Sequence, residues 1–95
     1  MTPARRRHIA PTVPGGEPVC VLTAEGARGR RVPINRILEH GEMRASANGY
    51  EIRLPAGDEH WMLANAFAEE EAGCCAAMAF EVAESDTAIL LMATF

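Results

Sequence analysis

Several features that mark common classes of protein are missing from this sequence. It contains no lysine, and its glycines lack the strand–turn–helix setting of a phosphate-binding loop, which argues against nucleotide-dependent catalysis. No stretch approaches the roughly 18 consecutive apolar residues that cross a bilayer. The apolar run of a secretory signal is also missing after the first arginines. We therefore expect a cytoplasmic protein that does not cross a membrane.

The chain is short, and its 95 residues fit one domain better than two. Residues 1–18 contain four of the six prolines and few large apolar side chains, so ordering them would bury little surface. We predict a flexible N-terminal arm over residues 1–18, followed by a single α+β domain over residues 19–95.

Basic and acidic residues are separated along the chain. Residues 1–53 contain nine arginines and five glutamates, a net charge of +4, whereas residues 54–95 contain eight acidic and no basic residues, a net charge of −8. This separation predicts that the two halves fold against each other, or that two copies of the chain do so. Only Arg5–Arg7 and the group Arg28, Arg30 and Arg31 are locally basic, too little for a nucleic-acid-binding face. We do not expect DNA or RNA as a partner.

Two helices are predicted. Ile34, Ile37 and Leu38 have the spacing of a buried helical stripe, which indicates a short helix near residues 33–40. Asp58 can cap a second helix that reaches Ala72 or a little beyond. Residues 23–33 contain helix-weakening glycines, and the sequence leaves open whether they are helical.

Two hairpins are predicted as well. Asn48-Gly49 is a favoured type I′ turn pair, and the register that it sets would place Arg44 opposite Arg53 on a solvated polar face. Ser85-Asp86 separates a second pair of strands, in which Val82 would face Ile89. Together these elements predict an α+β fold with a four-stranded antiparallel sheet, two hairpins, and helices packed on one face.

The last hairpin is apolar on both of its faces. Two short helices can cover only one face of the sheet, so the other face needs a different cover. A homodimer through the C-terminal hairpin is the economical solution. The residues expected on this second face are Ala79, Ala83, Ala88, Leu90 and Met92.

The sequence contains few residue patterns that are typical of catalytic sites. His8, His40 and His60 lie on three separate segments without metal-ligand spacing, and the serines lack the setting of a nucleophile. We therefore predict a protein that is not an enzyme.

The cysteines form the main candidate site. An odd count of three, without an export signal, favours reduced thiols over disulfides. Cys74 and Cys75 follow Glu71 closely and could be joined by Cys20, giving ligands for a thiophilic metal ion such as Zn(II), Cu(I) or Hg(II). The alternative is that Cys74 and Cys75 are small buried packing residues.

The acidic run Glu69–Glu71 lies near the expected end of the second helix, where carboxylates oppose the helix dipole. A positive group should therefore lie nearby. We expect arginines of the basic half to supply it, with Arg28, Arg30, Arg31 and Arg36 as candidates.

Three segments carry a resemblance to a known family: Cys20-Val21-Leu22-Thr23, Gly49-Tyr50 with the strand after it, and Glu71-Ala72-Gly73-Cys74-Cys75. Over residues 19–92 the chain resembles small uncharacterised bacterial proteins, some of which accompany heavy-metal or arsenic resistance genes. Their Glu-Arg-x-Cys-Cys-Pro-Phe segment differs here, because Ala72 replaces the arginine and Ala76-Ala77 replace Pro-Phe. The resemblance implies a Cys20, Cys74 and Cys75 group with a thiol or metal role.

Two functions from different classes follow. The first is a small non-catalytic dimeric interaction module. The alternative is a soft-metal or metalloid-binding accessory protein that uses the three-cysteine cluster.

Overall fold

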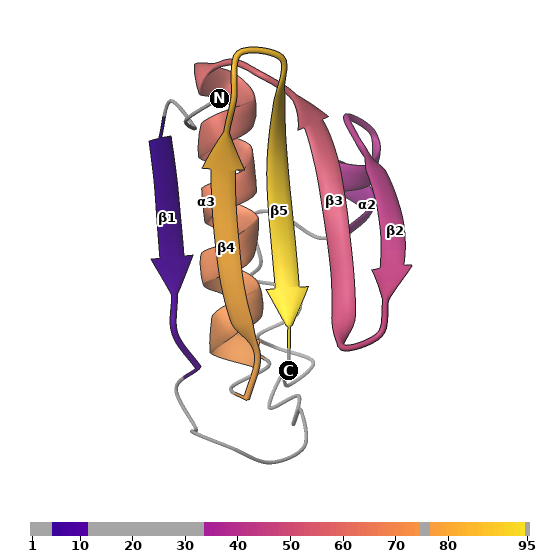
Figure 1. Ribbon diagram of the computed structural model, residues 1–95, viewed down its shortest axis with the longest axis vertical. Coiled ribbons are helices and arrows are strands. Elements are labelled where there is room, and N and C mark those ends of the chain that lie inside the picture. The colour runs from indigo at the N-terminus through magenta and orange to yellow at the C-terminus, as the bar shows by residue number, and fades with distance from the viewer. Residues whose placement is uncertain (1–4, 12–33, 75–76, 95) are drawn as a thin grey trace.

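The computed structural model describes residues 5–11, 34–74 and 77–94, the side chain of Cys74 excepted (Figure 1). The chain forms an antiparallel sheet with two helices, which confirms the predicted α+β class. Neither helix in the described part of the chain is long and apolar enough to cross a membrane. The elements are β1 (Arg5–Ile9), α2 (Ile34–Leu38), β2 (Glu42–Ser46), β3 (Gly49–Pro55), α3 (Asp58–Cys74), β4 (Ala79–Glu84) and β5 (Ala88–Thr94).

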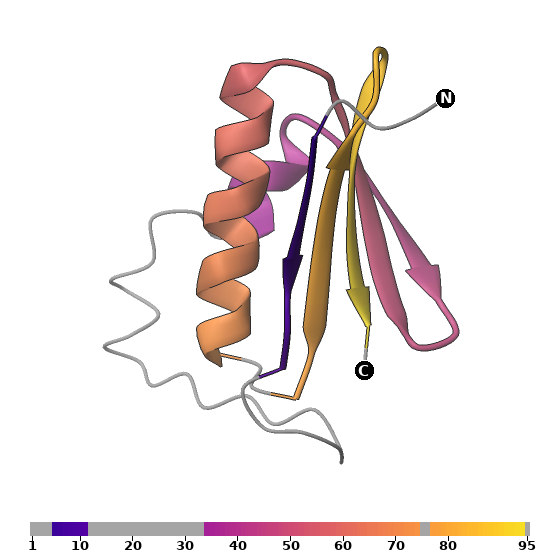
Figure 2. The ribbon, with the colours of Figure 1, turned by 60° about the vertical axis from the view of Figure 1, so that its left-hand side comes forward.

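The sheet has five strands in the order β1-β4-β5-β3-β2, and every neighbouring pair is antiparallel. β3 and β4 therefore run parallel on either side of β5, and α3 connects them across one face of the sheet. Figure 2 shows α3 and α2 together on this face, and none of the described elements covers the other one. We call the uncovered side the bare face.

The prediction of four strands was wrong because Arg5–Ile9 adds a fifth. This segment lies within the N-terminal arm that we predicted to be flexible, yet it forms β1 and pairs along β4, with Arg5 opposite Glu84 and Ile9 opposite Phe80. Burial of large apolar side chains was the wrong criterion for this strand. Its three consecutive arginines instead meet acidic residues of β4 and α3.

Both helices lie where the sequence indicates them. α2 is short and is fixed by Ile37, which is fully buried. α3 begins as predicted at Asp58, and the Gly57 carbonyl accepts its first hydrogen bond from the Trp61 N–H at 2.9 Å. The side of α3 that faces the sheet is apolar, because the helix buries Ala64, Phe67, Ala68 and Ala72.

The first hairpin has a different register from the predicted one. Ser46 pairs with Gly49, so the turn is Ala47-Asn48, and Arg44 lies opposite Glu51 rather than opposite Arg53. A type I′ turn needs two central residues with positive φ, and among the described residues only Gly49 and Gly57 have it. Asn48 therefore lacks the conformation that our prediction required.

The turn of the second hairpin lies one residue later in the chain than predicted. Glu84 pairs with Ile89 and Val82 with Leu91, so Asp86-Thr87 form the turn instead of Ser85-Asp86. The Ser85 N–H donates to the Ala88 carbonyl at 2.8 Å, and this bond closes the turn. The faces of the strands were nevertheless predicted correctly, because a shift by two residues in pairing keeps every side chain on its side.

The core lies between the helices and the sheet. Burial alternates strictly along β4 and β5, which places every second residue under α3. The largest fully buried side chains are Ile37, Ile52, Leu54, Phe67, Phe80, Val82, Ile89 and Leu91.

Candidate functional site

An apolar strip runs along the middle of the bare face. It comes from half-buried positions of β4 and β5 that alternate with the core positions under α3, and Glu81 is the one charged residue among these positions. We name these residues the apolar strip: Ala79, Ala83, Ala88, Leu90 and Met92. The sequence predicted the same five residues on this side.

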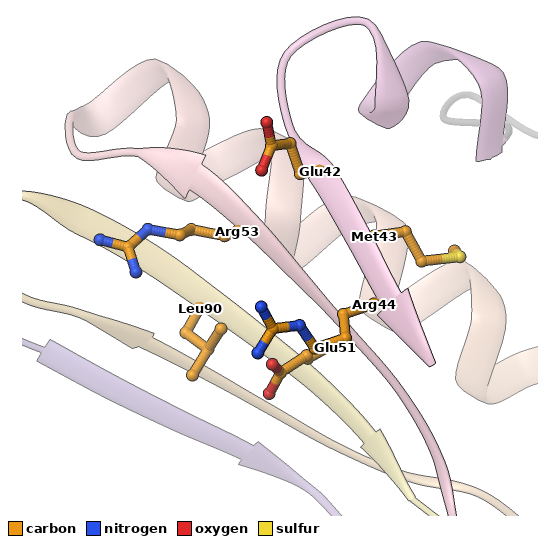
Figure 3. A pocket seen from close by; sticks show the side chains of 6 residues that line it. All are labelled: Glu42, Met43, Arg44, Glu51, Arg53 and Leu90. Carbon is orange, nitrogen blue, oxygen red and sulfur yellow. The ribbon is translucent and has the colours of Figure 1, made fainter. Parts of the chain in front are cut away.

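Charged residues flank the strip on the side of β3 and β2. Arg53 lies opposite Glu42 in the sheet, and Glu51 lies opposite Arg44. Figure 3 shows the side chains of Arg44 and Glu51 pointing toward each other beside Leu90. These residues border a hollow of about 390 Å³, lined by Glu42, Met43, Arg44, Glu51, Arg53 and Leu90.

On the other side of the strip, Glu81 of β4 and Arg6 of β1 form an ion pair. The Arg6 Nε atom lies 3.2 Å from a carboxylate oxygen of Glu81, and His8 is opposite Glu81 in the sheet. Among the described residues, the bare face thus holds three arginines (6, 44 and 53) and three glutamates (42, 51 and 81), whose charges sum to zero, whereas the whole chain has a net charge of −4. Such a face is suited to binding a surface that is apolar at its centre and mixed in charge around it.

Arg5 connects β1, β4 and the start of α3 on the helix side of the sheet. Its guanidinium donates from Nε to Glu84 at 2.7 Å and from Nη2 to Asp58 at 2.6 Å. The guanidinium carbon also lies 4.6 Å from the centroid of the Trp61 ring, a cation–π geometry. Arg5 therefore ties the edge strand to the rest of the domain.

Glu84 is the acidic centre of this group, with a residue exposure of 7%. It accepts hydrogen bonds from Arg5 and from the Gly57 N–H, the latter at 2.8 Å. The bond from Arg5, followed by that from Gly57, holds the pKa of Glu84 below its ordinary value. The bond to Glu84 in turn raises the pKa of Arg5, so both groups stay charged at neutral pH.

These bonds predict an acid-dependent effect of Glu84→Gln. Because the folded-state pKa of Glu84 is lowered, its ionised form stabilises the fold above the ordinary pKa of 4.5, and this contribution is lost as the pH falls through the lower folded-state value. We expect Glu84→Gln to lower the urea midpoint at pH 7 and to have a much smaller effect near pH 3. An equal loss of stability at both pH values would contradict this role for the ionised carboxylate.

At the acidic end of α3, Glu69 pairs with an arginine that was not among the predicted candidates. Arg7 of β1 forms an ion pair with Glu69 and also donates to the Asn65 side-chain oxygen at 3.2 Å. Asn65 is buried, and its amide nitrogen donates to the Trp61 carbonyl at 2.8 Å. Arg7 of the basic half thus places a positive charge beside Glu69, as expected of that half. Arg28, Arg30 and Arg31 lie outside the described residues.

Most of the predicted cysteine site also lies outside the described residues. This applies to Cys20 and Cys75, while Cys74 is the last residue of α3. Glu71 lies on α3 and is half-buried. The three-cysteine site therefore stays a prediction.

The structure brings together two histidines that sequence spacing did not connect. His40 follows α2 and His60 lies in the first turn of α3, and their ring centroids are 5.4 Å apart with the ring planes tilted by 58°. They border a hollow of about 320 Å³ between the two helices, together with Arg36, Glu59 and Met62. Within residues 5–11, 34–74 and 77–94, however, no group of three or more His, Cys, Asp or Glu side chains could hold a metal ion. Only the packing of α2 on α3 creates this proximity, and a single sequence carries no signal for it.

No protein-family model matches the chain, and neither a curated protein nor a solved structure does. The resemblance described from the sequence therefore stays a prediction.

Proposed function

We propose that the protein is a non-catalytic interaction module that acts as a homodimer joined through the bare face. The observation that supports this proposal is the apolar strip, which occupies the centre of the sheet on the side that no described helix covers. A sheet face with an apolar centre and a charged border has the anatomy of a protein interface.

The size of the bare face agrees with this proposal. The five strands, about 4.8 Å apart and about 20 Å long, give roughly 500 Å² on each copy and about 1,000 Å² in the pair. This total reaches the lower limit of about 1,000 Å² for a specific interface. A second copy offers the same apolar centre and the same zero net charge, so no excess of like charge opposes the pairing.

The test is the mass of the protein in solution. We expect light scattering at tens of micromolar to give twice the chain mass of 10.3 kDa. The Leu90→Glu and Met92→Glu double variant should give the mass of the single chain, because it would bury several carboxylates in the centre of a symmetric contact.

Met62→Glu is the matched control. Met62 lies on α3 with 70% of its surface exposed, away from the bare face, so the same kind of substitution there should leave the dimer mass unchanged. Circular dichroism should show that both variants stay folded. A single-chain mass for the unmodified protein, or a dimer that survives the double substitution, would contradict the proposal.

A further inference from the structure

The charges of the bare face form two rows across the sheet. Residues that pair across neighbouring strands form a row, and each row contains one residue from every strand. The two rows are two residues apart along each strand, so both lie on the bare face. Across β1, β4, β5, β3 and β2, the Leu90 row consists of Arg6, Ala83, Leu90, Arg53 and Glu42. In the same order, the Met92 row consists of His8, Glu81, Met92, Glu51 and Arg44.

On β3 and on β2, the residue in the Leu90 row and the residue in the Met92 row have opposite charges. On β3, Arg53 of the Leu90 row is followed by Glu51 of the Met92 row. On β2 the order is opposite, with Glu42 in the Leu90 row and Arg44 in the Met92 row. A rotation that exchanges the rows therefore places each of these charges opposite its complement.

Two symmetric arrangements keep the strands of two stacked sheets aligned. A twofold axis parallel to the strands leaves each residue in its own row and exchanges the flanks about β5. It would place Glu81 opposite Glu51 of the second copy, a repulsive contact that recurs on the other side of the axis.

A twofold axis perpendicular to the strands keeps each residue on its own strand and exchanges the rows. Arg53 then faces Glu51 of the second copy, and Glu42 faces Arg44. In the centre, Leu90 faces Met92, which joins the two apolar strips. On the other flank Glu81 faces Ala83 and Arg6 faces His8, so no two carboxylates oppose each other.

We infer that two copies pair bare face to bare face about a twofold axis that runs across the strands, between the Leu90 row and the Met92 row. This inference rests on the proposed function and specifies its geometry. Stacked sheets lie about 10 Å apart with their strands within about 30° of each other. Arginine and glutamate side chains on β3 can meet across that distance, and sheet twist displaces β3 little because it lies next to the central strand.

The test uses two variants that should each fail alone and succeed together. Arg53→Glu places two glutamates of β3 opposite two glutamates of the second copy, and Glu51→Arg places two arginines opposite two arginines. We expect each variant alone to dimerise at least about tenfold more weakly than the unmodified protein, since close charge pairs at interfaces contribute about 1.5 kcal/mol or more.

An equimolar mixture of the two variants should form a heterodimer with an affinity close to that of the unmodified protein. In the heterodimer every glutamate of β3 faces an arginine of β3 in the second copy. Each variant also disturbs its pairing with β2 inside one chain, but that disturbance persists in the mixture. Restored dimerisation therefore reports on the contact between copies. Native mass spectrometry separates the heterodimer from both homodimers by mass.

Arg36→Glu and Glu39→Arg form the control pair, because both residues are exposed on or next to α2, on the helix side. Neither variant nor their mixture should change the dimer affinity. A dimer of the unmodified protein without restoration in the mixture would overturn the row-exchanging axis and leave the proposed function standing. A single-chain mass for the unmodified protein would overturn both.

Discussion

Replacing Gly49 with alanine is expected to destabilise the protein by about 3 kcal/mol or more. Gly49 has a φ of 149°, which side-chain-bearing residues rarely adopt and which costs about 1–3 kcal/mol when forced. An added Cβ would also lie 1.9 Å from the Ala93 carbonyl oxygen and 2.8 Å from its carbon. Both are backbone atoms of β5 in the centre of the sheet, and they cannot move aside without breaking the pairing with β3. Urea unfolding at one fixed protein concentration measures the loss.

Gly57→Ala is the control that separates the cost of the positive φ from the cost of the clash with β5. Gly57 has a similar φ of 139°, but a Cβ there would have nothing within 4 Å. We therefore expect only the conformational cost, about 1–2 kcal/mol. Equal losses for Gly49→Ala and Gly57→Ala would show that the clash of the added Cβ with Ala93 does not contribute to the destabilisation.

The role of Gly49 explains why the first hairpin was predicted with the wrong register. The Asn48-Gly49 pair is a common turn sequence, and nothing in the local sequence shows that the glycine is needed for a close approach to β5. That approach depends on Ala93, which is more than forty residues away in the chain. The alternation of apolar and polar residues was informative nonetheless, because it assigns faces whatever the exact partners are. Ile52 and Leu54, which alternate with Glu51 and Arg53, are buried, whereas Met43 on the same side of β2 is 43% exposed.

β1 was missed for a related reason. We judged its segment by its prolines and its lack of large apolar residues, whereas the described structure attaches it through Arg5, Arg6 and Arg7. The separation of charge between the two halves of the chain did predict that they would meet. It could not predict which residues would meet, because Glu81 and Glu84 become neighbours of this segment only when β4 and β5 form a hairpin.

The candidate interface, too, could be predicted from the sequence only in part. The apolar strip could be predicted from the sequence because it needs only the two-residue period of one hairpin. The charges of β2 and β3 were interpreted as an ordinary solvated face, since their relation to the strip depends on β3 lying next to β5. With the strand order known, Arg53 and Glu51 flank Leu90 and Met92 directly. The same residues then set the symmetry of the proposed dimer.

Replacing Phe67 with alanine is expected to destabilise the protein by about 3–5 kcal/mol, because a buried aromatic side chain loses its transfer free energy and leaves a cavity. Phe67 is fully buried, and with Phe80 it fills the space between α3 and the sheet. Met62→Ala on the same helix is the control and should cost less than about 0.5 kcal/mol, since Met62 is 70% exposed.

The Phe67→Ala variant also distinguishes the two faces of the sheet. Phe67 packs on the side opposite the apolar strip, so the variant that remains folded should still have the dimer mass. The Phe67→Ala variant and the unmodified protein should be compared at the same concentration, because dimerisation makes the measured stability depend on protein concentration. If Phe67→Ala dissociated the dimer while the chain stayed folded, the contact between copies would have to involve the helix side. The bare face would then no longer account for the assembly.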